Sequence, residues 1–227
     1  MDPIDQIRDA IRRKMKQGAV VEKAFVCPQD LASIWSIERV HSLFPAGTWT
    51  TEQASLISVD LAKILSVLIL NGAKDVILQL RSGFFENNAS AFYYAGKHLN
   101  DKCLPLDIPD ITFLDAPRRD LFYEKQFIFI PVIIEESHNQ NTQDVHIHYR
   151  LPFEYEEKGI GCGAYGTVSK VGIASRHLRR EDGADWESVS RYSFATPESR
   201  FANKCLLRCR LWPVKPSKQA RRTSLKR

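Results

Sequence analysis

Three glycines in the second half of the chain have the spacing of a phosphate-binding loop. Gly161, Gly163 and Gly166 form the pattern G-x-G-x-x-G. Val168 extends this pattern to G-x-G-x-x-G-x-V. Because glycine has no Cβ, the backbone at these positions can come close to a phosphate chain. Its N–H groups can then face the phosphate oxygens. The spacing therefore suggests the binding of a nucleotide phosphate.

The residues on both sides of the glycines distinguish between two kinds of nucleotide site. A dinucleotide-binding loop needs a helix directly after the glycines and an acidic residue about 20 positions later. Glu181 and Asp182 supply the acid, but the β-branched residues within 167–173 and Gly172 disfavour the helix. Residues 151–155, before the loop, also predict a strand. Strand, glycine turn and strand is the hairpin that covers the phosphates in protein kinases. The alternatives are the dinucleotide loop and a glycine-rich hairpin without a ligand.

Five further segments resemble fungal serine/threonine protein kinases, which carry a helical segment ahead of the kinase domain. These segments are residues 63–70, 104–106, 122–127, 151–153 and 176–178. The resemblance extends over about residues 30 to 180, and the glycine loop is its one specific motif. It implies an α+β fold in which an N-terminal helical region leads into the strands of an incomplete kinase small lobe.

The resemblance also implies ATP as the ligand. A kinase needs a strand lysine that contacts the α- and β-phosphates, and residues 201–204 (Phe-Ala-Asn-Lys) resemble the V-A-I-K strand that supplies it. Asn203 departs from that pattern, because an apolar residue is expected there. The alternative is that Lys204 is one more base of a basic tail. The residues expected to contact the nucleotide are Ile160, Gly161, Gly163, Ala164, Tyr165, Gly166, Val168 and Lys204.

The other catalytic motifs of a kinase are missing from this sequence. There is no H-R-D and no D-F-G; residues 118–121 imitate H-R-D-L but lack the histidine and precede the glycine loop. Without these aspartates, nothing holds Mg²⁺ or orients the acceptor hydroxyl. We therefore expect no catalytic residue, no metal site and no activity from this chain alone, with Mg²⁺ entering only alongside a large lobe. The alternatives are a non-catalytic module whose helical region binds a protein partner, and a non-functional gene-model fragment.

The net charge of +5 is unevenly distributed. Ten basic and no acidic residues follow Glu198, and the rest of the chain has 22 basic and 27 acidic residues. Residues 221–224 fit R-R-x-S, which predicts Ser224 as a phosphorylation acceptor for a kinase with acidic pockets. Residues 215–227 could instead be a nuclear-import signal or bind polyanions. We expect residues 211–227 to be disordered.

Composition also limits the location and the partners of the chain. The longest apolar stretch, residues 56–70, is too short and too charged to span a bilayer. No apolar segment follows the basic N-terminus, so no signal peptide is predicted. We expect an intracellular protein, cytoplasmic or nuclear, without membrane or nucleic-acid partners. The five cysteines form no C-x-x-C pair and predict free thiols.

The expected domains are a helical region (1–120), a partial small lobe (121–210) and a basic tail (211–227). In the strand expected at 144–149, His146 and His148 would share one face, as solvated residues rather than metal ligands. The other predicted elements are helices near 3–16, 28–40, 56–70, 75–80 and 89–99, and a strand over 126–134. Asp2 and Pro3 favour a helix start, and the helical spacing predicts two core faces: Ile4, Ile7 and Ile11, and Leu31, Ile34, Trp35, Ile37 and Val40.

The signals at the ends of the apolar stretch are also local. Thr50 or Thr51 with Gln53 could cap the next helix, and Asn71-Gly72 is expected to end the helix over 56–70.

Overall fold

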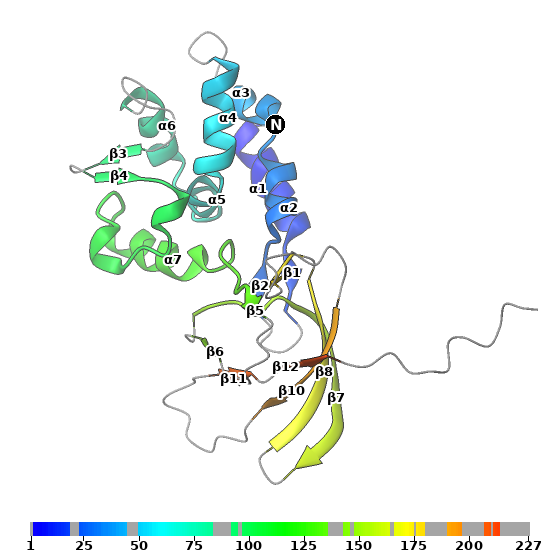
Figure 1. Ribbon diagram of the computed structural model, residues 1–227. Coiled ribbons are helices and arrows are strands. Elements are labelled where there is room, and N and C mark those ends of the chain that lie inside the picture. Colours follow the sequence, from blue (N-terminus) through cyan, green and yellow to red (C-terminus); the bar gives the residue numbers. More distant parts are fainter. Residues whose placement is uncertain are drawn as a thin grey trace, which may run out of the picture. The chain divides into compact units, whose positions relative to one another are not determined.

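The chain is an α+β protein in which helices and small sheets are combined (Figure 1). The computed structural model describes residues 2–18, 23–44, 50–83, 92–94, 97–135, 143–145, 148–163, 166–174, 176–179, 190–196, 207–209 and 211–213. These residues belong to two compact units. The first consists of Met1–Ile133 with His148–Pro152, and the second of Ile134–Ile147 with Phe153–Arg227.

The first helix, α1 (Pro3–Lys14), begins where the sequence predicts. Asp2 accepts a hydrogen bond from the N–H of Ile4 (3.1 Å), and proline is well tolerated at the first helical position. The predicted stripe of Ile4, Ile7 and Ile11 is buried. After α1, the short strand β1 (Lys16–Gln17) pairs antiparallel with β2 (Ala24–Phe25).

The helical pattern predicted after Pro28 is divided between α2 (Pro28–Ile34) and α3 (Ile37–Leu43). Ser36 starts the second helix by accepting a hydrogen bond from the N–H of Arg39 (3.4 Å). Trp35, at the break, is 1% exposed. Its indole N–H donates to the buried Ser66 hydroxyl (2.8 Å). Of the apolar residues predicted here as a core face, Leu31, Ile34, Trp35 and Val40 are buried, and Ile37 is partly buried against the core.

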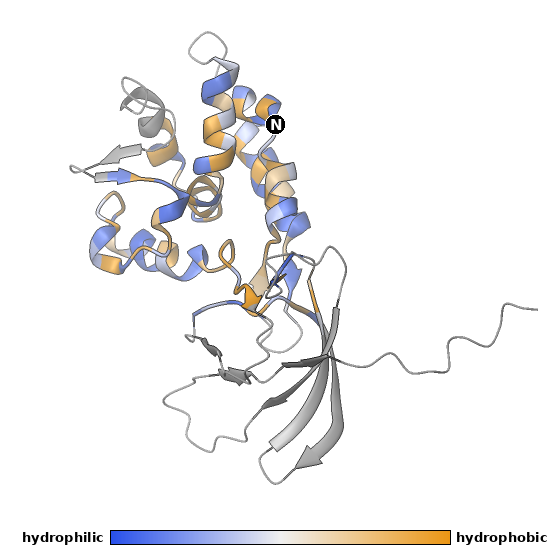
Figure 2. Ribbon diagram, viewed as in Figure 1, coloured by the Kyte–Doolittle hydropathy of each residue, from blue (hydrophilic) through white to orange (hydrophobic). Residues whose placement is uncertain are grey.

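The prediction of a single buried helix over residues 56–70 is wrong. The stretch forms the end of α4 (Thr51–Asp60) and the whole of α5 (Ala62–Leu70), two helices that are bent by 71° at Leu61. Only α5 is buried along nearly its whole length; on α4, Val59 is 69% exposed. Figure 2 shows hydrophobic and hydrophilic residues alternating along α4. Within the described part of the chain, no single helix is long and apolar enough to cross a membrane, and only this bent pair passes by length and composition.

A distant carboxylate explains the break. Asp101 accepts hydrogen bonds from the backbone N–H groups of Lys63 (2.9 Å) and Ile64 (3.0 Å). These groups lie in the first turn of α5, where a helix has no internal acceptors for its N–H donors. Leu61 has a non-helical backbone (φ −130°, ψ −1°). The chain changes direction there, and the first N–H groups of α5 point to Asp101.

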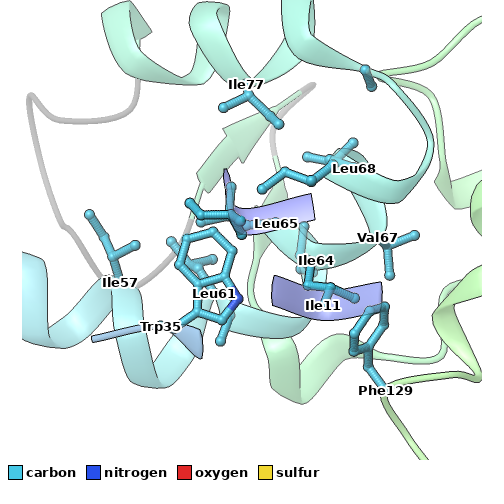
Figure 3. Close-up of a cluster of buried hydrophobic side chains, with 14 of the residues drawn as sticks. Ile11, Trp35, Ile57, Leu61, Ile64, Leu65, Val67, Leu68, Ile77 and Phe129 are labelled. Carbon is cyan, nitrogen blue, oxygen red and sulfur yellow. The ribbon is translucent and has the colours of Figure 1, made fainter. Parts of the chain in front are cut away.

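The core of the first unit forms around α5 (Figure 3). Its side chains pack with residues from α1, α2, α4, α6 and the segment after α7. The helix ends at Asn71 and Gly72, as predicted, and Gly72 adopts a left-handed backbone (φ 72°). The labelled members of this core are Ile11, Trp35, Ile57, Leu61, Ile64, Leu65, Val67, Leu68, Ile77 and Phe129.

The next predicted helix is confirmed as α6 (Lys74–Gly83), but the helix predicted at 89–99 is wrong. This region contains two strands instead, β3 (Phe92–Tyr94) and β4 (Lys97–Leu99), and they pair antiparallel. Aromatic residues favour strands because they pack well on a pleated surface, and β3 consists only of such residues. The 3₁₀ turns η1 (Asp101–Cys103) and η2 (Ile108–Asp110) lie in the connector that follows.

The strand predicted over 126–134 is also wrong for most of its length. Helix α7 (Ala116–Gln126) includes the first residue, turns follow, and only the short strand β5 (Ile134–Glu135) overlaps the end. The carboxamide of Gln126 is fully buried and pairs with both the N–H (2.7 Å) and the C=O (2.9 Å) of Leu106. Of the apolar residues after it, Phe127, Ile128 and Phe129 are buried in turns rather than in a sheet, whereas Ile133 is 43% exposed.

The strand predicted at 144–149 is shorter than expected. Strand β6 (Gln143–Val145) ends before His148, which lies in a turn. The His148 ring stacks on Phe127 (centroids 5.4 Å apart) and meets Tyr123 edge to face (5.3 Å). His148 is therefore half-buried in an aromatic cluster rather than solvated on a strand, while His146 lies outside the described residues.

The second unit contains a four-stranded antiparallel sheet in the order β12-β10-β8-β7. Its strands are β7 (Phe153–Gly163), β8 (Gly166–Ile173), β10 (Ser190–Thr196) and β12 (Leu211–Pro213). Strand β6 pairs with β11 (Leu207–Cys209), and β5 pairs in parallel with β9 (Leu178–Arg179). The first three residues of the predicted disordered tail thus form β12, and residues 214–227 lie outside the described part.

Candidate functional site

The glycine motif lies at the turn end of a β-hairpin. Strands β7 and β8 are antiparallel, and only residues 164 and 165 separate Gly163 from its partner Gly166. Two positions further from the turn, Gly161 is opposite Val168. The predicted order of strand, glycine turn and strand is confirmed. Because β8 follows the glycines directly, the helix that a dinucleotide-binding loop requires is not present at this position.

The hairpin is bent because its two strands differ in length. Strand β7 has 11 residues and β8 has 8. The additional residues of β7 are accommodated at two register shifts, between Phe153 and Tyr155 and between Glu157 and Gly161. Bulges of this kind bend a strand and increase its twist. Figure 1 shows β7 and β8 curving together. Such a curved hairpin can arch over a bound molecule.

The structure brings five of the predicted nucleotide contacts together on this hairpin: Ile160, Gly161, Gly163, Gly166 and Val168. The first lies within the second register shift. Four predicted residues, Ala164, Tyr165, Lys204 and the phosphorylation candidate Ser224, lie outside the described residues.

The strand beside β8 carries residues that the sequence did not single out. Strand β10 has the sequence Ser-Arg-Tyr-Ser-Phe-Ala-Thr, which contains one arginine and no lysine. It pairs with β8 over seven consecutive residues without a shift, and Ala195 is opposite Val168. Residues directly opposite each other in an antiparallel pair lie on the same face of the sheet. In this register Ser193 is opposite Lys170 and Arg191 is opposite Gly172.

The segment that imitates a catalytic H-R-D motif has a structural role. Arg118, in the first turn of α7, forms ion pairs of 2.6 Å with Asp75 of α6 and with Asp115. Its carbonyl accepts a hydrogen bond from the Asn71 side chain (2.6 Å). Hydrogen bonds from Arg118 lower the pKa of the Asp75 carboxyl, and backbone and side-chain hydrogen bonds from Arg118 lower that of Asp115. The arginine connects two helices and is not arranged for catalysis.

Other chemically active groups of the described chain are dispersed. Across the described ranges, no three His, Cys, Asp or Glu side chains form a group that could hold a metal ion. Cys27 is buried and Cys103 exposed, and both are free thiols, as predicted for the chain. Among the described residues, Asp101 is the one buried acid. Its carboxylate already accepts hydrogen bonds from the N–H groups at the N-terminus of α5.

Comparison with known proteins does not identify a family: no family model, no curated protein and no solved structure matches this chain. The glycine hairpin is thus the feature from which a function can be argued.

Proposed function

We propose that the β7–β8 hairpin binds the phosphate chain of ATP, as the glycine-rich hairpin of a serine/threonine protein kinase does. The observation that supports this is the position of the three glycines at the end of a bent antiparallel hairpin. There the backbone can approach an anion closely, and its N–H groups can serve as hydrogen-bond donors. The third strand, β10, lies next to β8 but contains no lysine, and the predicted strand lysine, Lys204, lies outside the described residues.

The proposed role of this chain is nucleotide binding without phosphoryl transfer. Transfer depends on positioning the acceptor and on metal ions that neutralise the developing charge. The sequence contains neither H-R-D nor D-F-G to supply the aspartates for these tasks. Phosphoryl transfer from ATP to protein serine or threonine would belong to a longer kinase in which the large lobe adds those residues and Mg²⁺.

A titration of the chain with ATP tests the proposal. We expect saturable binding that weakens at least about tenfold in Gly163→Val, because a side chain there keeps the backbone away from the phosphates. Ser190→Val is the matched control, since Ser190 is opposite Ile173 at the far end of the same sheet. Circular dichroism of each variant establishes that it is folded. Equal ATP affinity of Gly163→Val and the wild type would refute phosphate binding by this loop.

A second candidate function is a non-catalytic module in which the first unit binds a protein partner. It is favoured by the exposure of Val59 (69%) and Leu56 (39%) on α4, although the unit has a well-buried core of its own. Such exposed apolar residues are common at protein interfaces when they lie close together. A folded chain that binds no ATP at millimolar concentration would favour this module over the kinase-like role.

A further inference from the structure

We infer that the outer edge of strand β7 is protected against pairing with a second copy of this chain, and that the charges of Glu156 and Glu157 provide the protection. The inference goes beyond the proposed nucleotide binding and does not depend on it. It comes from the order of the strands in the sheet, the length of β7 and its register with β8.

Strand β7 lies at one end of the four-stranded sheet. Strand β8 pairs with one side of it, and none of the described strands pairs with the other side. β7 has 11 residues, which is about twice the usual length of a strand. A long edge strand presents a row of backbone N–H and C=O groups with which another chain can pair. A strand of this length at an edge therefore needs protection.

The opposite edge of the same sheet is protected in a simple way. Strand β12 has only three residues and ends at Pro213, which has no N–H to donate. Short edge strands and prolines are two of the means by which proteins prevent pairing between edges. β7 is long and contains no proline, so its protection has another source.

The register shifts leave only two regular runs on β7. One is Gly161–Gly163 beside the turn, where two glycines weaken the strand. The other is Tyr155–Glu157, which pairs with three consecutive residues of β8. Bulges interrupt a ladder and twist the edge, so the shifts on either side of this second run are poor places for pairing. The run Tyr155–Glu157 is thus the part of the edge where a second copy can add a strand.

This run and the residue before it are acidic. If two copies of the run pair antiparallel in full, Glu156 is opposite Glu156 of the second copy. A shift of one residue in either direction sets Glu156 opposite Glu157, or Glu154 opposite Glu157. Lys158, the one basic residue of β7, falls within the second register shift. Like charges directly opposite each other destabilise a strand pair, so all three registers are disfavoured.

Sedimentation velocity of the full chain at increasing concentration tests the inference. The wild type should be monomeric. The double variant E156Q/E157Q removes both charges, and we expect it to self-associate with a dimer dissociation constant at least about tenfold below that of the wild type. E38Q/E52Q is the matched control, because it removes two exposed glutamates from α3 and α4 and the same amount of charge. The control should remain monomeric.

A charge reversal separates the effect of charge from that of the register shifts. E156K/E157K should be monomeric alone, because lysines then repel each other. Mixed with the wild type it should associate, since glutamates are then opposite lysines. Hydrogen exchange locates the contact: the amides of residues 155–157 should become protected in the mixture but not in either protein alone.

The inference is overturned if either E156Q/E157Q or the mixture stays monomeric while circular dichroism shows that each variant is folded. It is also overturned if the wild type dimerises with protection of the amides of residues 155–157. Both results are independent of ATP binding, so they are distinguishable from a failure of the proposed function.

Discussion

The N-termini of α4 and α5 are capped in two different ways. α4 is capped by its own residues: the Thr50 hydroxyl accepts from the N–H of Gln53 (3.2 Å), and the Gln53 side chain accepts from the N–H of Thr50 (2.9 Å). α5 is capped by Asp101, which is 37 residues from Ile64 along the chain. A local cap can be recognised in the sequence, whereas a cap supplied by tertiary structure cannot.

The same contrast applies to the second unit. In the β7–β8 hairpin, Gly163 pairs with Gly166, only three positions later, which is a local feature. The register that places Lys170 opposite both Glu157 and Ser193 depends on the pairing of three strands and on two register shifts. The hairpin is therefore visible in the sequence, but the strand that pairs beside it and the register shifts are not.

The largest effect is expected from removing the tertiary cap. Asp101→Ala should lower the free energy of unfolding by about 2 to 3 kcal/mol, because two N–H groups at the buried start of α5 lose their acceptor. Urea unfolding at neutral pH, followed by circular dichroism, measures this change. A loss below about 0.5 kcal/mol would mean that solvent replaces the carboxylate and that the break after α4 has another cause.

A smaller loss is expected from the local cap. Thr50→Ala should lower the free energy of unfolding by about 1 kcal/mol, the usual cost of losing such an N-terminal cap. Thr50→Ser, which keeps the hydroxyl, is the matched control and should remain close to the wild type. If Thr50→Ala costs more than Asp101→Ala in the same urea experiment, the proposed order of local and tertiary contributions is reversed.

The smallest effect is a dependence on pH. Burial raises the pKa of the Asp101 carboxyl above its ordinary value of 3.8, although the N–H groups of Lys63 and Ile64 oppose this. A raised pKa in the folded state means that the folded protein holds this proton more tightly than the unfolded chain. The associated stability is complete below 3.8 and is lost as the pH rises through the folded pKa.

Urea unfolding of the wild type and of Asp101→Asn, compared between about pH 3 and pH 7, measures this effect. The difference in free energy of unfolding, wild type minus variant, should decrease as the pH rises. An increase over the same range would show that the hydrogen bonds to the carboxylate outweigh its burial.

By itself, the sequence determined the features that depend on neighbouring residues. It predicted the start of α1 at Asp2 and Pro3, a cap of Thr50 or Thr51 with Gln53 where α4 begins, the end of α5 at Asn71 and Gly72, and the glycine hairpin. Each of these depends on a side chain or a backbone preference within a few positions, so propensity and spacing suffice.

Only the tertiary structure decided where long apolar stretches break and which strands pair. Residues 56–70 form two helices because Asp101 provides an N-terminus for the second. The residues after Gln126 are turns because that side chain pairs with the backbone of Leu106 and the core takes up the apolar residues that follow. Similarly, the pairing of β8 with β10 places Ala195 opposite Val168. In each case the partner is distant in sequence, and spacing alone cannot specify which distant groups will meet.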